Sequence, residues 1–108
     1  LTQLAAISTF LHNIYNGLEN ILKRIALFRG VTLSRSSTWH KDLLLSSHKQ
    51  GIFSEKSLND LMNLLSFRHF FVHSYVFNVT WIDLKPLAQS IDKVVHRFKK
   101  EIFRFLAL

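Results

Sequence analysis

The chain contains no cysteine, and its 108 residues include only three glycines and one proline. The absence of cysteine excludes disulfides, thiolate metal sites and cysteine nucleophiles, and it fits a reducing compartment such as the cytoplasm. The scarcity of helix breakers favours long helices over many short strands. No apolar run approaches the roughly 18 residues of a membrane span, so we expect no membrane segment.

Acidic residues are also scarce relative to basic ones. Fourteen Lys and Arg face seven Asp and Glu, which gives a formal net charge of +7. A small basic protein attracts polyanions, so nucleic acid, an anionic membrane surface and an acidic protein all remain open as partners. Hydrophobic residues make up 48% of the chain, which is enough for a core. We therefore expect residues 1–108 to form a single domain.

Apolar residues recur at alternating steps of three and four over residues 2–29, which predicts one long helix. Gly30 follows the pattern and is suited to end this helix. The expected apolar stripe consists of Leu4, Ile7, Leu11, Ile14, Leu18, Ile21, Ile25 and Phe28.

Three further helices are expected, over about 38–49, over 54–76, and from residue 83 onward. Ser54 and Asp83 are the expected N-caps of the last two, and residues 78–82 are interpreted as their connection. Long helices with short loops predict an all-α fold, an antiparallel up-and-down bundle of four or five helices. The alternative organisation is a helical hairpin that completes its core only as a dimer.

The third helix carries the most informative stretch, residues 66–75 with the sequence SFRHFFVHSY. Arg68 and Tyr75 occupy positions where the helical pattern calls for apolar residues. A helical projection places Arg68, His69, His73 and Tyr75 on one side of the helix. The opposite side holds Phe67, Phe70 and Phe71. Because a buried, unpaired charge is costly, we expect this polar side to open into a cleft or to meet an anion.

These residue types suit metal-independent cleavage of RNA. Histidine can take or give a proton near neutral pH, and arginine can hold a phosphate and stabilise developing charge. A second copy of the helix across a two-fold axis would supply another Arg68 and His73. Two plainer interpretations stay open: His73 is a hydrogen-bonded core histidine, or His69 and His73 bind zinc. No acidic third ligand is evident nearby, so we expect no metal and no other cofactor.

The stretch resembles the Arg-x4-His motif of HEPN domains, here Arg68 to His73. With Tyr75 it is similar to the longer Arg-x4-His-x-Tyr form of HepT-like toxins, and residues 38–44 (TWHKDLL) also look like that family. The resemblance implies a HEPN-like bundle that dimerises so that both motifs line one cleft. It also implies a metal-independent endoribonuclease with Arg68 and His73 as the catalytic pair, assisted by His69, that leaves 2′,3′-cyclic phosphate ends.

The resemblance further implies a toxin–antitoxin system. The partner is then a minimal nucleotidyltransferase antitoxin, which silences the toxin by transferring AMP to Tyr75. The competing interpretation is a non-catalytic HEPN helper domain that binds such a nucleotidyltransferase. A more remote one is a membrane-surface protein, suggested by the basic last helix.

Two further residues are candidates for contact with RNA or with a partner, His40 and Ser74. His40 follows Trp39 in the short second helix, where a surface or packing histidine is the plainer interpretation. Trp39 and Trp81 are both interpreted as core residues.

Overall fold

The computed structural model describes residues 2–74 and 80–107, which form four helices. In chain order they are α1 (Thr2–Phe28), α2 (Trp39–Lys49), α3 (Glu55–Ser74) and α4 (Trp81–Phe105). No strand occurs in the described ranges, so the predicted all-α, four-helix fold is confirmed. None of the helices, as far as they are described, is long and apolar enough to cross a membrane.

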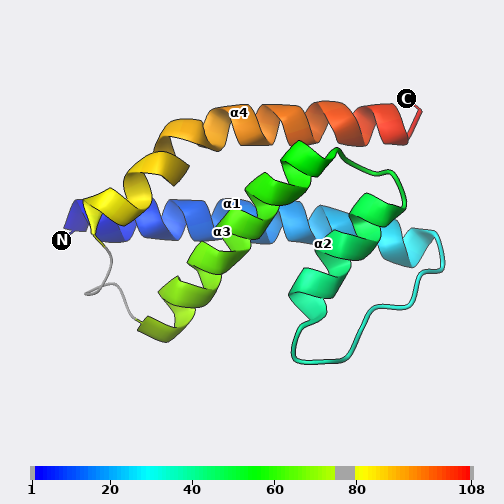
Figure 1. The fold of residues 1–108 in the computed structure, drawn as a ribbon, viewed down its shortest axis with the longest axis horizontal. Coiled ribbons are helices and arrows are strands. Elements are labelled where there is room, and N and C mark those ends of the chain that lie inside the picture. Colours follow the sequence, from blue (N-terminus) through cyan, green and yellow to red (C-terminus); the bar gives the residue numbers. More distant parts are fainter. Residues whose placement is uncertain (1, 75–79, 108) are drawn as a thin grey trace.

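The helices form a flat arrangement that measures 42 × 30 × 18 Å, which is about two helices thick. Figure 1 shows α1 and α4 running in the same direction along the long axis, while α2 and α3 form an antiparallel pair that crosses α1. The predicted alternation of directions therefore holds for α2 and α3 but not for α1 and α4. The reason is that α3 returns toward the end of the molecule where α1 begins, so α4 starts from there.

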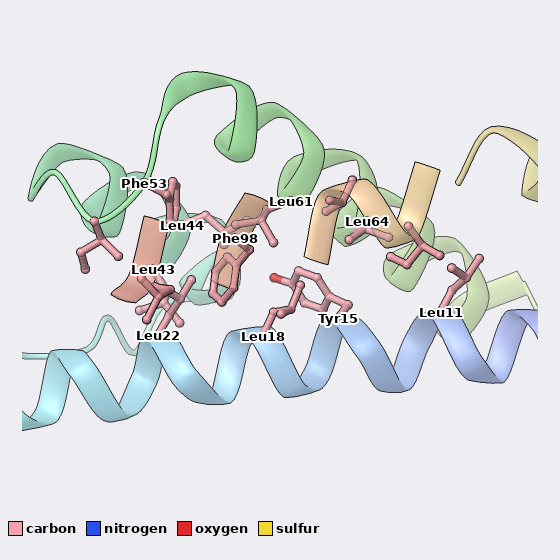
Figure 2. Packing of buried hydrophobic residues seen from close by; sticks show 14 of the residues in the cluster. Leu11, Tyr15, Leu18, Leu22, Leu43, Leu44, Phe53, Leu61, Leu64 and Phe98 are labelled. Atoms are coloured by element: carbon pink, nitrogen blue, oxygen red, sulfur yellow. The ribbon is translucent and has the colours of Figure 1, made fainter. Parts of the chain in front are cut away.

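The core is one continuous cluster of buried apolar side chains to which all four helices contribute. Figure 2 shows Leu11, Tyr15, Leu18 and Leu22 of α1 pointing toward residues of the other helices. The α1 face differs from the predicted stripe, because Tyr15 and Leu22 are buried whereas Phe28 is 93% exposed. Residues on both flanks of Leu11 and Leu18 are apolar, so periodicity alone does not decide which flank packs inward.

Glycine ends α1 as the sequence predicts, and a second glycine follows α2. Gly30 and Gly51 have φ angles of +73° and +82°, in the left-handed region that favours glycine. After each glycine, a backbone hydrogen bond reaches back to the last turn of the helix. Val31 N donates to Ala26 O at 2.8 Å, and Ile52 N donates to Ser47 O at 3.1 Å. At the next helix, the hydroxyl of Ser54 accepts from Ser57 N at 3.2 Å, which confirms Ser54 as the cap of α3.

The start of α4 differs from the prediction. Thr80 is the N-cap, and its hydroxyl accepts from Asp83 N at 3.3 Å while the Asp83 carboxylate accepts from Thr80 N at 3.3 Å. This is a capping box, in which both residues contribute and the threonine comes first. The prediction that Asp83 is the cap was therefore wrong by three residues, and Trp81 begins the helix instead of lying in a connection. Trp81 is 46% exposed and is not a core residue, whereas Trp39 packs against the core as expected.

We expect Thr80→Ala to lower the free energy of unfolding by about 1 kcal/mol, because the backbone N–H of Asp83 loses its acceptor. Urea unfolding followed by circular dichroism measures this change. Thr32→Ala is the matched control, since Thr32 is an exposed threonine outside the helices, and it should change stability by less than about 0.5 kcal/mol. Equal effects of the two substitutions would contradict the role of the capping box.

Candidate active site

A hollow of about 320 Å³ lies between the start of α2 and the second half of α3. Figure 1 shows these two helices side by side, with α1 behind them. The described lining residues include no acid. Two of them, Lys41 and Arg68, are positively charged, and His40 and His69 become so on protonation. The lining consists of Ser37, Thr38, His40, Lys41, Leu65, Ser66, Arg68 and His69.

Arg68 reaches the hollow from α3 and is half-buried. Its Nε–H donates to Oδ1 of Asn16 at 3.2 Å, so an amide of α1 fixes the guanidinium. In the described ranges no carboxylate forms an ion pair with Arg68. The positive charge therefore faces the hollow without an acidic partner there, which is the condition for binding an external anion.

A second hydrogen bond extends this contact along α1. The Nδ2 amide of Asn16 lies 3.1 Å from Nε2 of His12 and donates to it, because its Oδ1 accepts from Arg68. Burial lowers the pKa of His12, and the positive charge of Arg68 lowers it further. His12 is thus held in the neutral form, and its ring lies 5.2 Å from the ring of Phe71. Of the three residues Arg68, Asn16 and His12, only Arg68 therefore carries a positive charge.

A buried carboxylate forms a separate contact between α1 and α2. Glu19 is only 4% exposed, and one of its oxygens, Oε2, accepts from the Tyr15 hydroxyl at 2.9 Å and lies 2.6 Å from Nδ1 of His40. Burial raises the pKa of Tyr15, and the negative charge of Glu19 raises it further, so the phenol remains a donor. This carboxylate holds the imidazole of His40, and the Trp39 ring stacks on that imidazole with 3.7 Å between the ring centroids.

Three of the residues singled out in the sequence come together in this hollow, namely His40, Arg68 and His69. The aromatic side of this segment of α3 packs inward, since Phe67 is buried and Phe70 and Phe71 pack against the core. Of the predicted polar side, the described side chains Arg68 and His69 line the hollow, whereas the three phenylalanines pack with the core.

The other predicted site residues fall at or beyond the end of α3. His73 and Ser74 belong to its last turn, but their side chains are not among those described. Tyr75 lies outside the described residues. Among the residues that are described, no three His, Cys, Asp or Glu side chains are grouped as a metal site requires.

Sequence reasoning missed the polar residues of α1 that lie behind the hollow. His12, Asn16 and Glu19 follow one another at intervals of about one turn, on the flank of the apolar stripe. A signal was present, because Glu19 is the only acidic residue in the 27 residues of α1. An isolated acid beside a long apolar stripe is a candidate for a buried, hydrogen-bonded carboxylate.

The lowered pKa of His12 predicts a loss of stability on acidification. Its imidazole binds a proton in the unfolded chain near pH 6.5 but only at lower pH in the folded chain, so the free energy of unfolding falls as pH decreases below about 6.5. His12→Asn should make this decline shallower, as measured by urea unfolding at about pH 7.5 and about pH 5.5. His96→Asn, at an exposed position of α4, should keep the slope of the unchanged protein. An unaltered slope in His12→Asn would refute the assignment.

The similarity to known proteins covers much more of the chain than the Arg68–Tyr75 motif. A family model described as "HepT-like protein" matches residues 6–108, which is nearly the whole chain. Searches of curated proteins and of solved structures gave no significant match. The match includes α2, α3 and α4 and nearly all of α1, and thus every described residue that lines the hollow. The chain therefore belongs to the HepT-like protein family, within the HEPN-like superfamily, as its Arg-x4-His-x-Tyr sequence predicted.

Proposed function

We propose that this protein is a metal-independent endoribonuclease that acts as the toxin of a toxin–antitoxin system. Membership of the HepT-like family supports the general class. The observation that carries the proposal is the environment of Arg68, a half-buried guanidinium at the wall of a basic hollow with no acidic partner among the described residues. The phosphodiester backbone of RNA supplies the missing negative charge.

The proposed reaction needs two proton transfers and one anion site. The ribose 2′-oxygen attacks the adjacent phosphorus while its proton leaves, and the bond from phosphorus to the 5′-oxygen breaks while that oxygen gains a proton. The products are a 2′,3′-cyclic phosphate and a 5′-hydroxyl end. Arg68 binds the non-bridging phosphate oxygens and stabilises the charge that develops on them. In this proposal His73 carries one of the protons, and His69, which lines the hollow, assists it.

We infer that the working form is a homodimer. His73 follows Arg68 by five residues, so the two positions lie about 140° apart in helical projection, near the two edges of the polar side. A second copy placed against this part of α3 brings an Arg68 and a His73 from different chains to one phosphate. Exposed apolar side chains occur at Val72 near the end of α3 and at Trp81 and Ile82 at the start of α4, and such a contact would cover them.

Arg68→Ala and His73→Ala should each reduce RNA cleavage by at least about 100-fold, because one loses the anion site and the other a proton carrier. The assay uses labelled RNA with EDTA present, and end analysis detects the cyclic phosphate. Sedimentation of the same samples reports whether the protein is a dimer.

The controls for this experiment are Arg24→Ala and His96→Ala, at exposed positions of α1 and α4 that do not line the hollow. Both should cleave RNA at the normal rate. Circular dichroism must show that all variants keep their helices. If the unchanged protein binds a nucleotidyltransferase tightly but cuts no RNA at any concentration, the protein is a non-catalytic helper and the proposal fails.

We propose that the antitoxin is a nucleotidyltransferase that silences the toxin by adenylylation of Tyr75. The phenol oxygen attacks the α-phosphorus of ATP, pyrophosphate leaves, and the phenolic proton passes to solvent. The AMP group adds an anion to the residue seven positions after Arg68 in the sequence. Such an anion competes with RNA for Arg68.

Co-expression with the nucleotidyltransferase should add one or more AMP groups to the chain, all on the peptide that contains Tyr75. Tyr15 is the internal control, because the chain has only two tyrosines and Tyr15 is buried and bonded to Glu19. Tyr75→Phe should remove the added mass completely in intact-protein mass spectrometry. Modification that persists in Tyr75→Phe would show that another residue is the acceptor.

A further inference from the structure

His40 is held in a way that a surface histidine does not require. Its Nδ1 lies 2.6 Å from the buried oxygen of Glu19, one face of its ring is covered by Trp39, and the side chain keeps 21% exposure at the wall of the hollow. One nitrogen of the ring is therefore turned to the interior, while part of the ring remains accessible from the cleft. Arg68 lines the same cleft from the opposite helix.

The contacts of Glu19 determine which nitrogen of His40 carries the proton. A carboxylate accepts hydrogen bonds, and its Oε2 already accepts from the Tyr15 hydroxyl. Nδ1 of His40 is therefore the donor to Glu19, which leaves Nε2 of the neutral ring with its lone pair. An imidazole oriented through Nδ1 by a carboxylate, with Nε2 ready to accept a proton, is the arrangement of a general base.

We propose that His40 is the general base of the cleavage reaction and that Glu19 is its positioning residue. This inference rests on the proposed function. Nε2 of His40 takes the proton from the 2′-hydroxyl as the 2′-oxygen forms its bond to phosphorus. The bond to the 5′-oxygen breaks, and His73 gives that oxygen its proton. Water later returns both histidines to their starting protonation states, so the reaction balances without a metal.

In the proposed dimer, Arg68 on α3 and His40 on α2 line the hollow of one chain, and Glu19 on α1 holds His40. The second copy supplies His73, so the base and the acid belong to different chains. Among the described residues, Glu19 bonds His40 from α1, and Lys41, Arg68 and His69 line the hollow with it. Tyr15 bonds the same carboxylate, and Lys23 lies over the Trp39 ring.

The decisive experiment compares two RNA substrates, one normal and one with sulfur in place of the bridging 5′-oxygen at the cleavage site. A thiolate leaves without receiving a proton, so a protein that lacks its general acid recovers on the sulfur substrate, whereas one that lacks its general base does not. His40→Ala should lower kcat on normal RNA by about 100-fold or more with little change in KM, and the sulfur substrate should not restore it. His73→Ala should recover on the sulfur substrate.

Each outcome of this comparison bears on a different claim. Normal cleavage by His40→Ala would overturn the inference and leave the proposed function standing. Recovery of His40→Ala on the sulfur substrate would identify His40 as the acid and also overturn it. If the protein without substitutions cuts neither substrate, both the proposed function and the inference are wrong. His48→Ala, another α2 histidine that does not line the hollow, should cleave at the normal rate.

The role of Glu19 is tested by the tautomer of His40. Nitrogen NMR of the histidine side chains should show the proton of neutral His40 on Nδ1 in the unchanged protein. Glu19→Gln keeps the shape of the side chain but can turn its amide to donate instead, so we expect part of the signal to shift to the Nε2–H form, with lower kcat and unchanged KM. A lower kcat with an unchanged tautomer would show that Glu19 has only a structural role. Should Glu19→Gln fail to fold, the His40→Ala comparison still decides the inference.

Discussion

The arrangement of the cleft depends on how the carboxylate of Glu19 is satisfied inside the helical core. Removing an ionised carboxylate from water costs several kcal/mol, which only hydrogen bonds and nearby positive charge offset. Tyr15 donates from the same helix and His40 from the next one, so one buried oxygen links α2 to α1 beside the apolar core that both helices share. The amide of Asn16 holds Arg68 in the same way from α1 to α3. The longest helix thus supports both walls of the hollow.

Much of the fold follows from the spacing of apolar residues and from local chemistry. The four helices, the glycine that ends α1 and the serine that caps α3 were predicted within a few residues, because each depends on side chains close in sequence. The flank of α1 that packs inward was not predictable, since both flanks are apolar and only the other helices decide between them. The start of α4 was placed too late, because Thr80 and Asp83 are both good caps and the structure uses both.

The site shows the same division. Arg68 and His69 were recognised because a charged residue interrupts an apolar pattern in a short stretch of one helix. Asn16 and Glu19 were missed, because a polar residue beside an apolar stripe is ordinarily turned to water. Their contacts are with α2 and α3, at residues 21 and 52 positions away in sequence. The isolated acid in α1 makes Glu19 a candidate for burial, but its partners and those of Asn16 are visible only in three dimensions.

The shared direction of α1 and α4 has an electrostatic consequence at one end of the molecule (Figure 1). Both helices present their carbonyl ends there, and two partial negative charges lie close together, which disfavours the pairing. Arginines stand at this point: Arg29 follows α1 and lies over the Phe105 ring of α4 at 4.9 Å, and Arg104 belongs to the last turn of α4. These two arginines therefore offset the repulsion between the two helix ends, which uses part of the excess positive charge of the chain. The positive field available to an anion elsewhere on the molecule is correspondingly smaller than the net charge alone suggests.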